Sequence, residues 1–101
     1  MYTPEEEYLS GQLAAAEMLR SGTTCFLEAG TIRFLDDVVE GLREIGIRGR
    51  VGRWIWDLPP EPDVYRQNTD EAIANLQAAL EAHPGGTPDP LIQAWLSLIH
   101  I

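Results

Sequence analysis

The pattern of apolar and polar positions predicts three helices. The first spans about residues 4–21, because Thr3-Pro4-Glu5-Glu6 has the form of a capping box with proline at the first helical position. Gly22 follows its last turn and is expected to end it. We expect this helix to bury a stripe made of Leu9, Leu13 and Ala16.

The second predicted helix ends at Gly46 and carries an apolar face of Ile32, Leu35, Val38, Val39, Leu42 and Ile45. The acidic residues between them belong to a solvated outer face: Asp36, Asp37, Glu40 and Glu44. A third helix begins at Thr69-Asp70-Glu71 and closes at His83-Pro84. Its expected core side consists of Ile73, Leu76 and Leu80.

Short runs rich in β-branched and aromatic residues predict strands at residues 23–27 and 47–57, and a third begins at 91–95. The first run is apolar on both faces, which favours a parallel strand covered on both sides. The order αβαβαβ predicts an α/β fold with parallel strands. Three such strands leave two open edges, so we expect a piece of a larger sheet.

Composition narrows the classes of function. The chain of 101 residues has 16 acidic and 7 basic side chains, for a net charge of −9, and every basic residue is arginine. The acidic excess argues against nucleic acid or an anionic membrane as a partner. The absence of lysine excludes a Walker phosphate loop and a Schiff-base lysine. Because no signal peptide or membrane-length apolar run is evident, a cytoplasmic location is the default.

The last six residues differ in composition from the rest. Residues 96–101 read Leu-Ser-Leu-Ile-His-Ile, whereas the body is rich in Ala, Gly, Pro and Arg. Their back-translation resembles the end of a transposon-derived sequencing adapter. We therefore expect residues 96–101 to be an adapter-derived tail, and the alternative is that they continue the third strand.

The run Glu17-Met18-Leu19-Arg20-Ser21-Gly22-Thr23-Thr24 resembles the amidohydrolase superfamily, in the branch of cytosine deaminase, chlorohydrolases and adenosine-type deaminases. The turn Glu44-Ile45-Gly46-Ile47-Arg48-Gly49 fits the same pattern. The resemblance implies a (β/α)₈ TIM barrel, of which residues 1–95 would supply the part from the first helix to the start of the fourth strand. It therefore predicts a partial barrel with parallel strands.

The resemblance also implies a metal-dependent hydrolytic reaction. Such enzymes use one or two divalent ions, Zn or Fe, to activate water that attacks a C–N or C–halogen bond of a small heterocyclic or amide-like substrate. The family's H-x-H pair is absent from this sequence. The chain is therefore expected to bind no metal and to be inactive by itself, even where its parent protein is an enzyme. Whether the parent forms oligomers is left open.

Three residues are candidates for facing a substrate, because barrel chemistry lies where the strands end. They are Glu28 after the first strand and Trp56 with Asp57 after the second. Each also has a plainer interpretation: Glu28 as a solvated carboxylate or arginine partner, Asp57 as a turn residue, and one of Trp54 and Trp56 as helix packing. An Arg53–Asp57 pair inside the barrel is a further alternative.

The remaining residues that could take part in catalysis or binding are better explained by structural roles. His83 has no second His, Cys or carboxylate nearby at the spacing of metal ligands, so we interpret it as a cation at the helix end or as a surface residue. Cys25 lies in an apolar strand, where a buried thiol would be inert. The series Gly46, Gly49 and Gly52 precedes a strand, so helix capping and close packing explain it better than a phosphate loop.

Two alternatives to an enzyme fragment stay open. The chain could be a small acidic interaction module that binds a partner at an open sheet edge. A part of a doubly wound nucleotide-binding domain is a third interpretation, against which the missing phosphate loop weighs.

Overall fold

The computed structural model describes residues 3–55, 67–84 and 91–96. The elements are α1 (Pro4–Arg20), β1 (Cys25–Leu27), α2 (Leu35–Ile45), β2 (Arg48–Val51), α3 (Thr69–Ala82) and β3 (Ile92–Ala94). This order confirms the predicted alternation of helix and strand. Within the described ranges, each helix is too short or too polar to cross a lipid bilayer.

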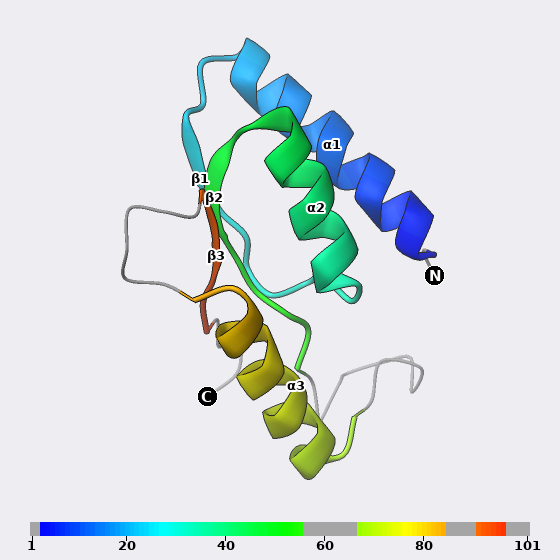
Figure 1. Ribbon diagram of the computed structural model, residues 1–101. Coiled ribbons are helices and arrows are strands. Elements are labelled where there is room, and N and C mark those ends of the chain that lie inside the picture. The colour runs from blue at the N-terminus through cyan, green and yellow to red at the C-terminus, as the bar shows by residue number, and fades with distance from the viewer. Residues whose placement is uncertain (1–2, 56–66, 85–90, 97–101) are drawn as a thin grey trace.

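The three strands form one parallel sheet in the order β1-β2-β3 (Figure 1). Phe26 pairs with Gly49, and Gly49 with Ile92, so these three residues share one face of the sheet. That face packs on the core, where Leu35, Val39 and Ile47 are almost fully buried. The α/β class with parallel strands is confirmed, and closure into a barrel stays a prediction.

The helix ends follow their local sequence. Thr3 and Glu6 form the predicted capping box at the start of α1. At the start of α3, Asn68 and Glu71 form an equivalent box. Gly46 ends α2 in the left-handed conformation with φ of 88°, which glycine adopts without steric cost.

Helix α1 does not bury the expected stripe. Leu9 and Leu13 are exposed, Leu13 by 64%, whereas Ala15 is fully buried. The reason is that α1 packs closely along α2, and a small residue faces the contact. The neighbouring Gly41 allows this approach, because a Cβ there would lie 3.0 Å from the main-chain oxygen of Tyr8.

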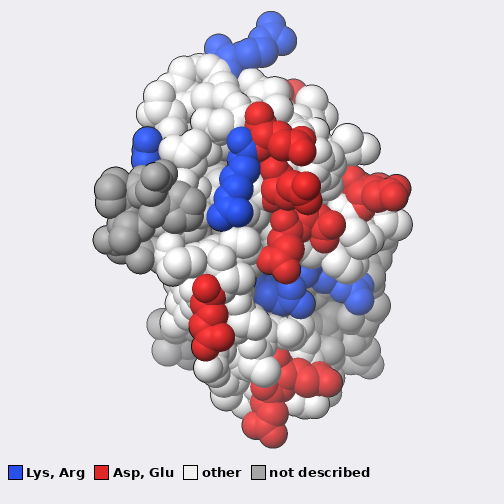
Figure 2. All heavy atoms as spheres, viewed as in Figure 1, with Lys and Arg blue, Asp and Glu red and all other residues white. Residues whose placement is uncertain are grey.

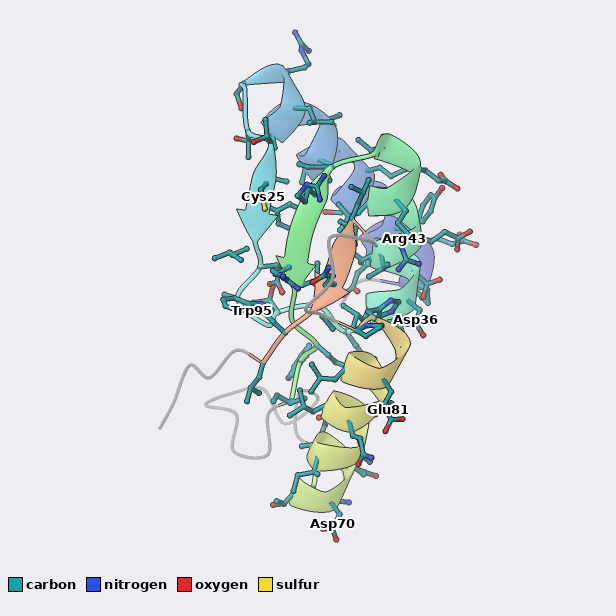
Figure 3. The ribbon with its side chains drawn as sticks, turned by 60° about the vertical axis from the view of Figure 1, so that its left-hand side comes forward. Cys25, Asp36, Arg43, Asp70, Glu81 and Trp95 are labelled. Carbon is teal, nitrogen blue, oxygen red and sulfur yellow. The ribbon has the colours of Figure 1, made fainter. Side chains whose placement is uncertain are left out.

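Helix α3 also departs from expectation. Figures 1 and 3 show that it extends beyond the carboxyl ends of the strands. Ala72 and Ala79 are its buried residues, whereas Ile73 is 58% exposed and Leu80 is exposed. The predicted core side is therefore wrong at Ile73 and Leu80, and Leu76 is only half-buried, because the face that carries Ala72 and Ala79 is the buried one.

Strand β1 is covered on one face only. Cys25 and Leu27 are exposed, Leu27 by 66%, and Phe26 packs against the core. The expectation of burial on both sides is wrong, because α1 and α2 lie on the Phe26 side of the sheet. Ile32 also lies outside α2: it forms an isolated parallel bridge with Arg53.

The glycine series has the structural roles that the sequence predicts. A Cβ at Gly49 would lie 2.3 Å from the ring of Phe26. A Cβ at Gly52 would lie 2.8 Å from the Cα of Gly30. Together with the left-handed cap at Gly46, these close approaches account for all three positions.

Candidate functional site at the carboxyl edge of the sheet

The carboxyl ends of the three strands meet at one edge. Main-chain hydrogen bonds extend the sheet past the strands, from Glu28 N to Arg50 O at 2.9 Å and from Trp95 N to Val51 O at 3.0 Å. In open parallel sheets and in barrels alike, ligands bind at this edge. It is therefore the candidate site of the described chain.

Glu28 lies at this edge, directly after the outer strand β1. One carboxylate oxygen accepts hydrogen bonds from the main chain of Gly30 at 2.8 Å and of Gly52 at 3.2 Å. The other accepts from the main chain and the hydroxyl of Thr31, at 2.9 and 2.6 Å. Four donors therefore hold this side chain against the loop after β1 and the end of β2. Its predicted role of facing a substrate stays a prediction.

Gly52 brings the ends of β1 and β2 together. Any side chain at this position would collide with the backbone of Gly30, which cannot move aside as a flexible side chain could. The left-handed φ of 94° at Gly30 turns the loop back toward Gly52. These two glycines allow the carboxylate of Glu28 to reach amides on both segments.

Trp95 extends the arrangement to β3. Its indole Nε1 donates to the main-chain oxygen of Glu28 at 2.8 Å, and Figure 3 shows Trp95 beside the end of β1. Sequence reasoning did not single out Trp95. No local signal reveals the contact, because the two residues are 67 positions apart.

Arg53 adds a cation at the same edge. It lines a pocket of about 230 Å³ together with Leu35 and Asp36 of α2 and with residues of α3. Its Nε is buried and has no hydrogen-bond partner among the described residues. Trp54 is buried, which is consistent with the interpretation that one of Trp54 and Trp56 serves packing. Trp56 and Asp57, and with them the Arg53–Asp57 pair, lie outside the described residues.

His83 is buried, which corrects the expectation of a surface residue. Its Nε2 lies 2.8 Å from Oδ1 of Asp36, and the two side chains are 8% and 85% exposed. The main-chain oxygen of His83 also accepts from Ala94 N at 2.8 Å. His83 thus joins the end of α3 to α2 and to β3. The burial follows from the position of α3, whose last turn lies near Asp36 (Figure 3).

Cys25 is exposed, so the expectation of a buried, inert thiol is also wrong. Its side chain lies on the face of β1 opposite the core. Across residues 3–55, 67–84 and 91–96, no three His, Cys, Asp or Glu side chains come together in a way that could hold a metal ion. The described residues therefore do not fit a divalent metal.

Acidic side chains form a band along the outer face of α2, as Figure 2 shows. The band contains Asp36, Glu40 and Glu44, all three of which are exposed as the sequence predicts. Glu44 accepts a short hydrogen bond from the hydroxyl of Tyr8 and a 2.8 Å bond from Gln12 Nε2. The bond to Glu44, with a smaller contribution from desolvation, raises the pKa of Tyr8 above its ordinary value of 10.0.

A mostly apolar cleft of about 410 Å³ lies between α1, α2 and β1. Gly11, Ala14 and Met18 of α1 line it on one side, and Phe26 and Leu27 on the other. Its polar lining comes partly from Glu7, whose carboxylate accepts from Phe34 N at 2.7 Å and so caps the entry to α2. The carboxylate of Glu7 therefore already has a structural hydrogen-bond partner.

Comparison with known proteins gives two curated relatives. A 5-methylthioadenosine/S-adenosylhomocysteine deaminase of Thermococcus kodakarensis is 36% identical over 76 residues, which cover 75% of this chain and 17% of the relative. A 5-methylthioadenosine/S-adenosylhomocysteine deaminase 1 of Syntrophus aciditrophicus is 33% identical over 90 residues, covering 89% of this chain and 18% of the relative. No protein-family model matches the chain, and no solved structure matches it significantly.

The chain thus spans less than a fifth of the length of either curated relative. Both relatives are deaminases, and the similarity supports the amidohydrolase superfamily without selecting a branch of it.

Proposed function

We propose that this chain is a segment of a metal-dependent hydrolase of the amidohydrolase superfamily, whose parent protein deaminates an aminated heterocycle. The observation that carries the proposal is the 36% identity over 76 residues to a 5-methylthioadenosine/S-adenosylhomocysteine deaminase. By that similarity, the substrate is a small molecule with an adenine-like ring, and the bond broken is C–N. A C–halogen substrate is the corresponding proposal for the chlorohydrolase branch.

In the parent, the segment would supply one arc of a (β/α)₈ barrel. The parallel sheet in sequential strand order supports this assignment. So does the convergence of loops at the carboxyl edge, because barrel enzymes place their sites there. Glu28 would hold the ends of the first two strands, and Trp56 and Asp57 would face the substrate.

A divalent ion, Zn or Fe, would supply an activated water in such an enzyme. The described residues do not provide ligands for it, and the sequence has no H-x-H pair. The ligands would therefore come from other parts of the parent, and the chain alone would be inactive.

The test uses the coding sequence that flanks residues 1–95 in the source DNA. The proposal expects an H-x-H pair upstream and further His and Asp residues downstream. The complete protein should release ammonia from 5-methylthioadenosine and lose that activity with a metal chelator. A metal-loaded complete protein that is inactive on adenine nucleosides would exclude the deaminase assignment, and flanking sequence without the ligands would exclude the superfamily.

The alternative is a small acidic interaction module without catalysis. The outer strand β1, on which Cys25 and Leu27 are exposed at an open edge of the described sheet, is the observation in its favour. Thermal unfolding of residues 1–95, followed by circular dichroism, discriminates between the two. A sharp cooperative transition favours the module, whereas an aggregating or molten chain favours the fragment.

A further inference from the structure

The mostly apolar cleft of about 410 Å³ lies between α1 and the outer strand β1. Phe26 lines it on the sheet side, Val38 lines it from α2, and Ser10 and Ala14 line it from α1. Both Ser10 and Ala14 are exposed, although they lie on the side of α1 that faces β1. Helix α1 therefore packs along α2, and among the described residues the cleft between α1 and β1 stays open.

The main chain of β1 has hydrogen-bonding groups at the same place. Glu28 N donates to Arg50 O at 2.9 Å, so Glu28 and its alternate neighbour Phe26 turn their amides toward β2. The N–H and C=O groups of Cys25 and Leu27 therefore point to the outer edge of β1, beside the cleft. Such a row of main-chain groups is a template for a further strand, whereas a small apolar ligand would make no use of it.

The connections between the elements indicate which segment would lie there. Helix α2 connects β1 to β2 on the face of the sheet that carries Phe26, and α1 leads into β1 on the same face (Figure 1). Crossovers between parallel strands have one hand, so helices on the same face step across the sheet in the same direction. A strand that α1 connects to β1 therefore lies on the side of β1 away from β2, which is the edge beside the cleft.

We propose that the cleft holds an apolar strand of the parent protein, encoded directly before α1, which pairs in parallel with the outer edge of β1. The chain spans less than a fifth of its relatives, so most of the parent lies outside it. Alternate side chains of this strand pack under α1 against Met18 and Phe26, and those between them share the other sheet face with Cys25 and Leu27. Small residues on α1 leave room for the strand: Ser10, Gly11 and Ala14.

The inference rests on the proposed function only in treating the chain as a segment of a longer protein. Its test places single cysteines along the segment upstream of residue 1 in the complete parent protein. One series combines them with A14C, in the cleft, and with C25S, and bridges the thiols with bismaleimidoethane. The other series uses the native Cys25 and mild oxidation, because neighbouring strands bring Cα atoms within disulfide distance. Mass spectrometry identifies the cross-linked peptides.

The expected result is an alternating pattern. Successive side chains of a strand point to opposite faces. Every second upstream position should therefore cross-link to A14C, and only the positions between them should cross-link to Cys25.

Two further measurements compare the cleft with the outer face of α2, where Glu40 is exposed. In the complete protein, A14C should react with iodoacetamide at least about tenfold more slowly than E40C, because a covered thiol reacts only through local opening. A14W, which fills the cleft, should lower the melting temperature, whereas E40W should leave it unchanged. The cross-links keep the proposal testable should A14W prevent folding.

Three results would overturn the proposal. The first is an A14C thiol as reactive as that of E40C. The second is a set of cross-links spaced by three and four positions, as in a helix, or arising from residues beyond 95. The third is cross-linking between copies in a mixture of isotope-labelled and unlabelled protein, which would show that a second copy fills the cleft.

The outcomes also separate this inference from the proposed function. A complete protein that shows the alternating pattern but deaminates no adenine nucleoside would retain the strand and refute the activity. An active deaminase without the pattern would do the reverse.

Discussion

The indole Nε1 of Trp95 donates a 2.8 Å hydrogen bond to the main-chain oxygen of Glu28. The two residues follow β3 and β1, which are not neighbours in the sheet, because β2 lies between them. The bond therefore ties together the ends of the two outer strands across the central one. Together with the carboxylate contacts of Glu28, it fixes the geometry of the edge where we place the candidate site.

Replacing Trp95 by Phe should weaken this tie. Phenylalanine has an aromatic ring smaller than indole and no N–H, so the carbonyl of Glu28 loses its donor. We expect a loss of about 1 kcal/mol in the free energy of unfolding, measured by urea denaturation. An unchanged midpoint in W95F would mean that the bond contributes nothing to stability.

The substitution Glu28→Gln keeps the shape of the side chain but replaces one accepting oxygen by an NH₂ group. That group would face N–H or O–H donors, since each carboxylate oxygen now accepts from two of them. We expect E28Q to lower the free energy of unfolding by about 1–3 kcal/mol. E17Q on the exposed surface of α1 is the control and should change it by less than about 0.5 kcal/mol. Equal effects of the two variants would contradict the role given to Glu28.

Substitutions at Gly46 and Gly52 test two different reasons for glycine, a left-handed backbone and a close approach of two chain segments. Gly46 has a positive φ, but a Cβ added there would meet nothing within 4 Å, and Asn tolerates that conformation. Gly52 lies against the backbone of Gly30. We expect G46N to cost less than about 1 kcal/mol, and G52N to cost about 1–3 kcal/mol or more, because its Cβ forces the backbone to shift. Urea denaturation of both variants checks this order, and the reverse order would refute the close approach.

The Tyr8–Glu44 bond predicts a dependence of stability on pH. Because the bond raises the pKa of Tyr8 in the folded chain above 10.0, it stabilises the fold in full below the ordinary tyrosine pKa. That contribution is lost as the pH rises through the raised value. Above about pH 10, the melting temperature of the unsubstituted chain should therefore fall more steeply with pH than that of Y8F. Parallel curves for the two proteins would mean that the bond is not made in solution.

The contact between His83 and Asp36 can be measured by a double-mutant cycle with H83A and D36N. His83 is buried but Asp36 is 85% exposed, so solvent weakens the interaction between them. We expect a coupling energy of about 0.2–1 kcal/mol that decreases with added salt. H83A alone should cost more than D36N alone, because it also leaves a cavity. A larger effect of D36N would argue that His83 is not buried.

Several features could be predicted from the sequence because they depend on nearby residues. The capping box at Thr3 and Glu6, the left-handed end of α2 at Gly46 and the alternation of helices and strands all follow from contacts within a few positions. The strand order is consistent with that alternation. Because the alternation predicts parallel strands, whose carboxyl ends lie at one edge, residues that follow the strands could also be placed at that edge, Glu28 among them.

The tertiary structure decided which faces are buried and what the edge residues contact. Leu13 and Ile73 have the polarity of core residues, yet both are exposed, because burial depends on the position of the whole helix and not on the residue. Trp95 and Glu28, or His83 and Asp36, meet only after the chain has folded back over many residues. A single sequence specifies periodicity along each element, but the packing between elements selects which apolar stripe is covered and which charges meet.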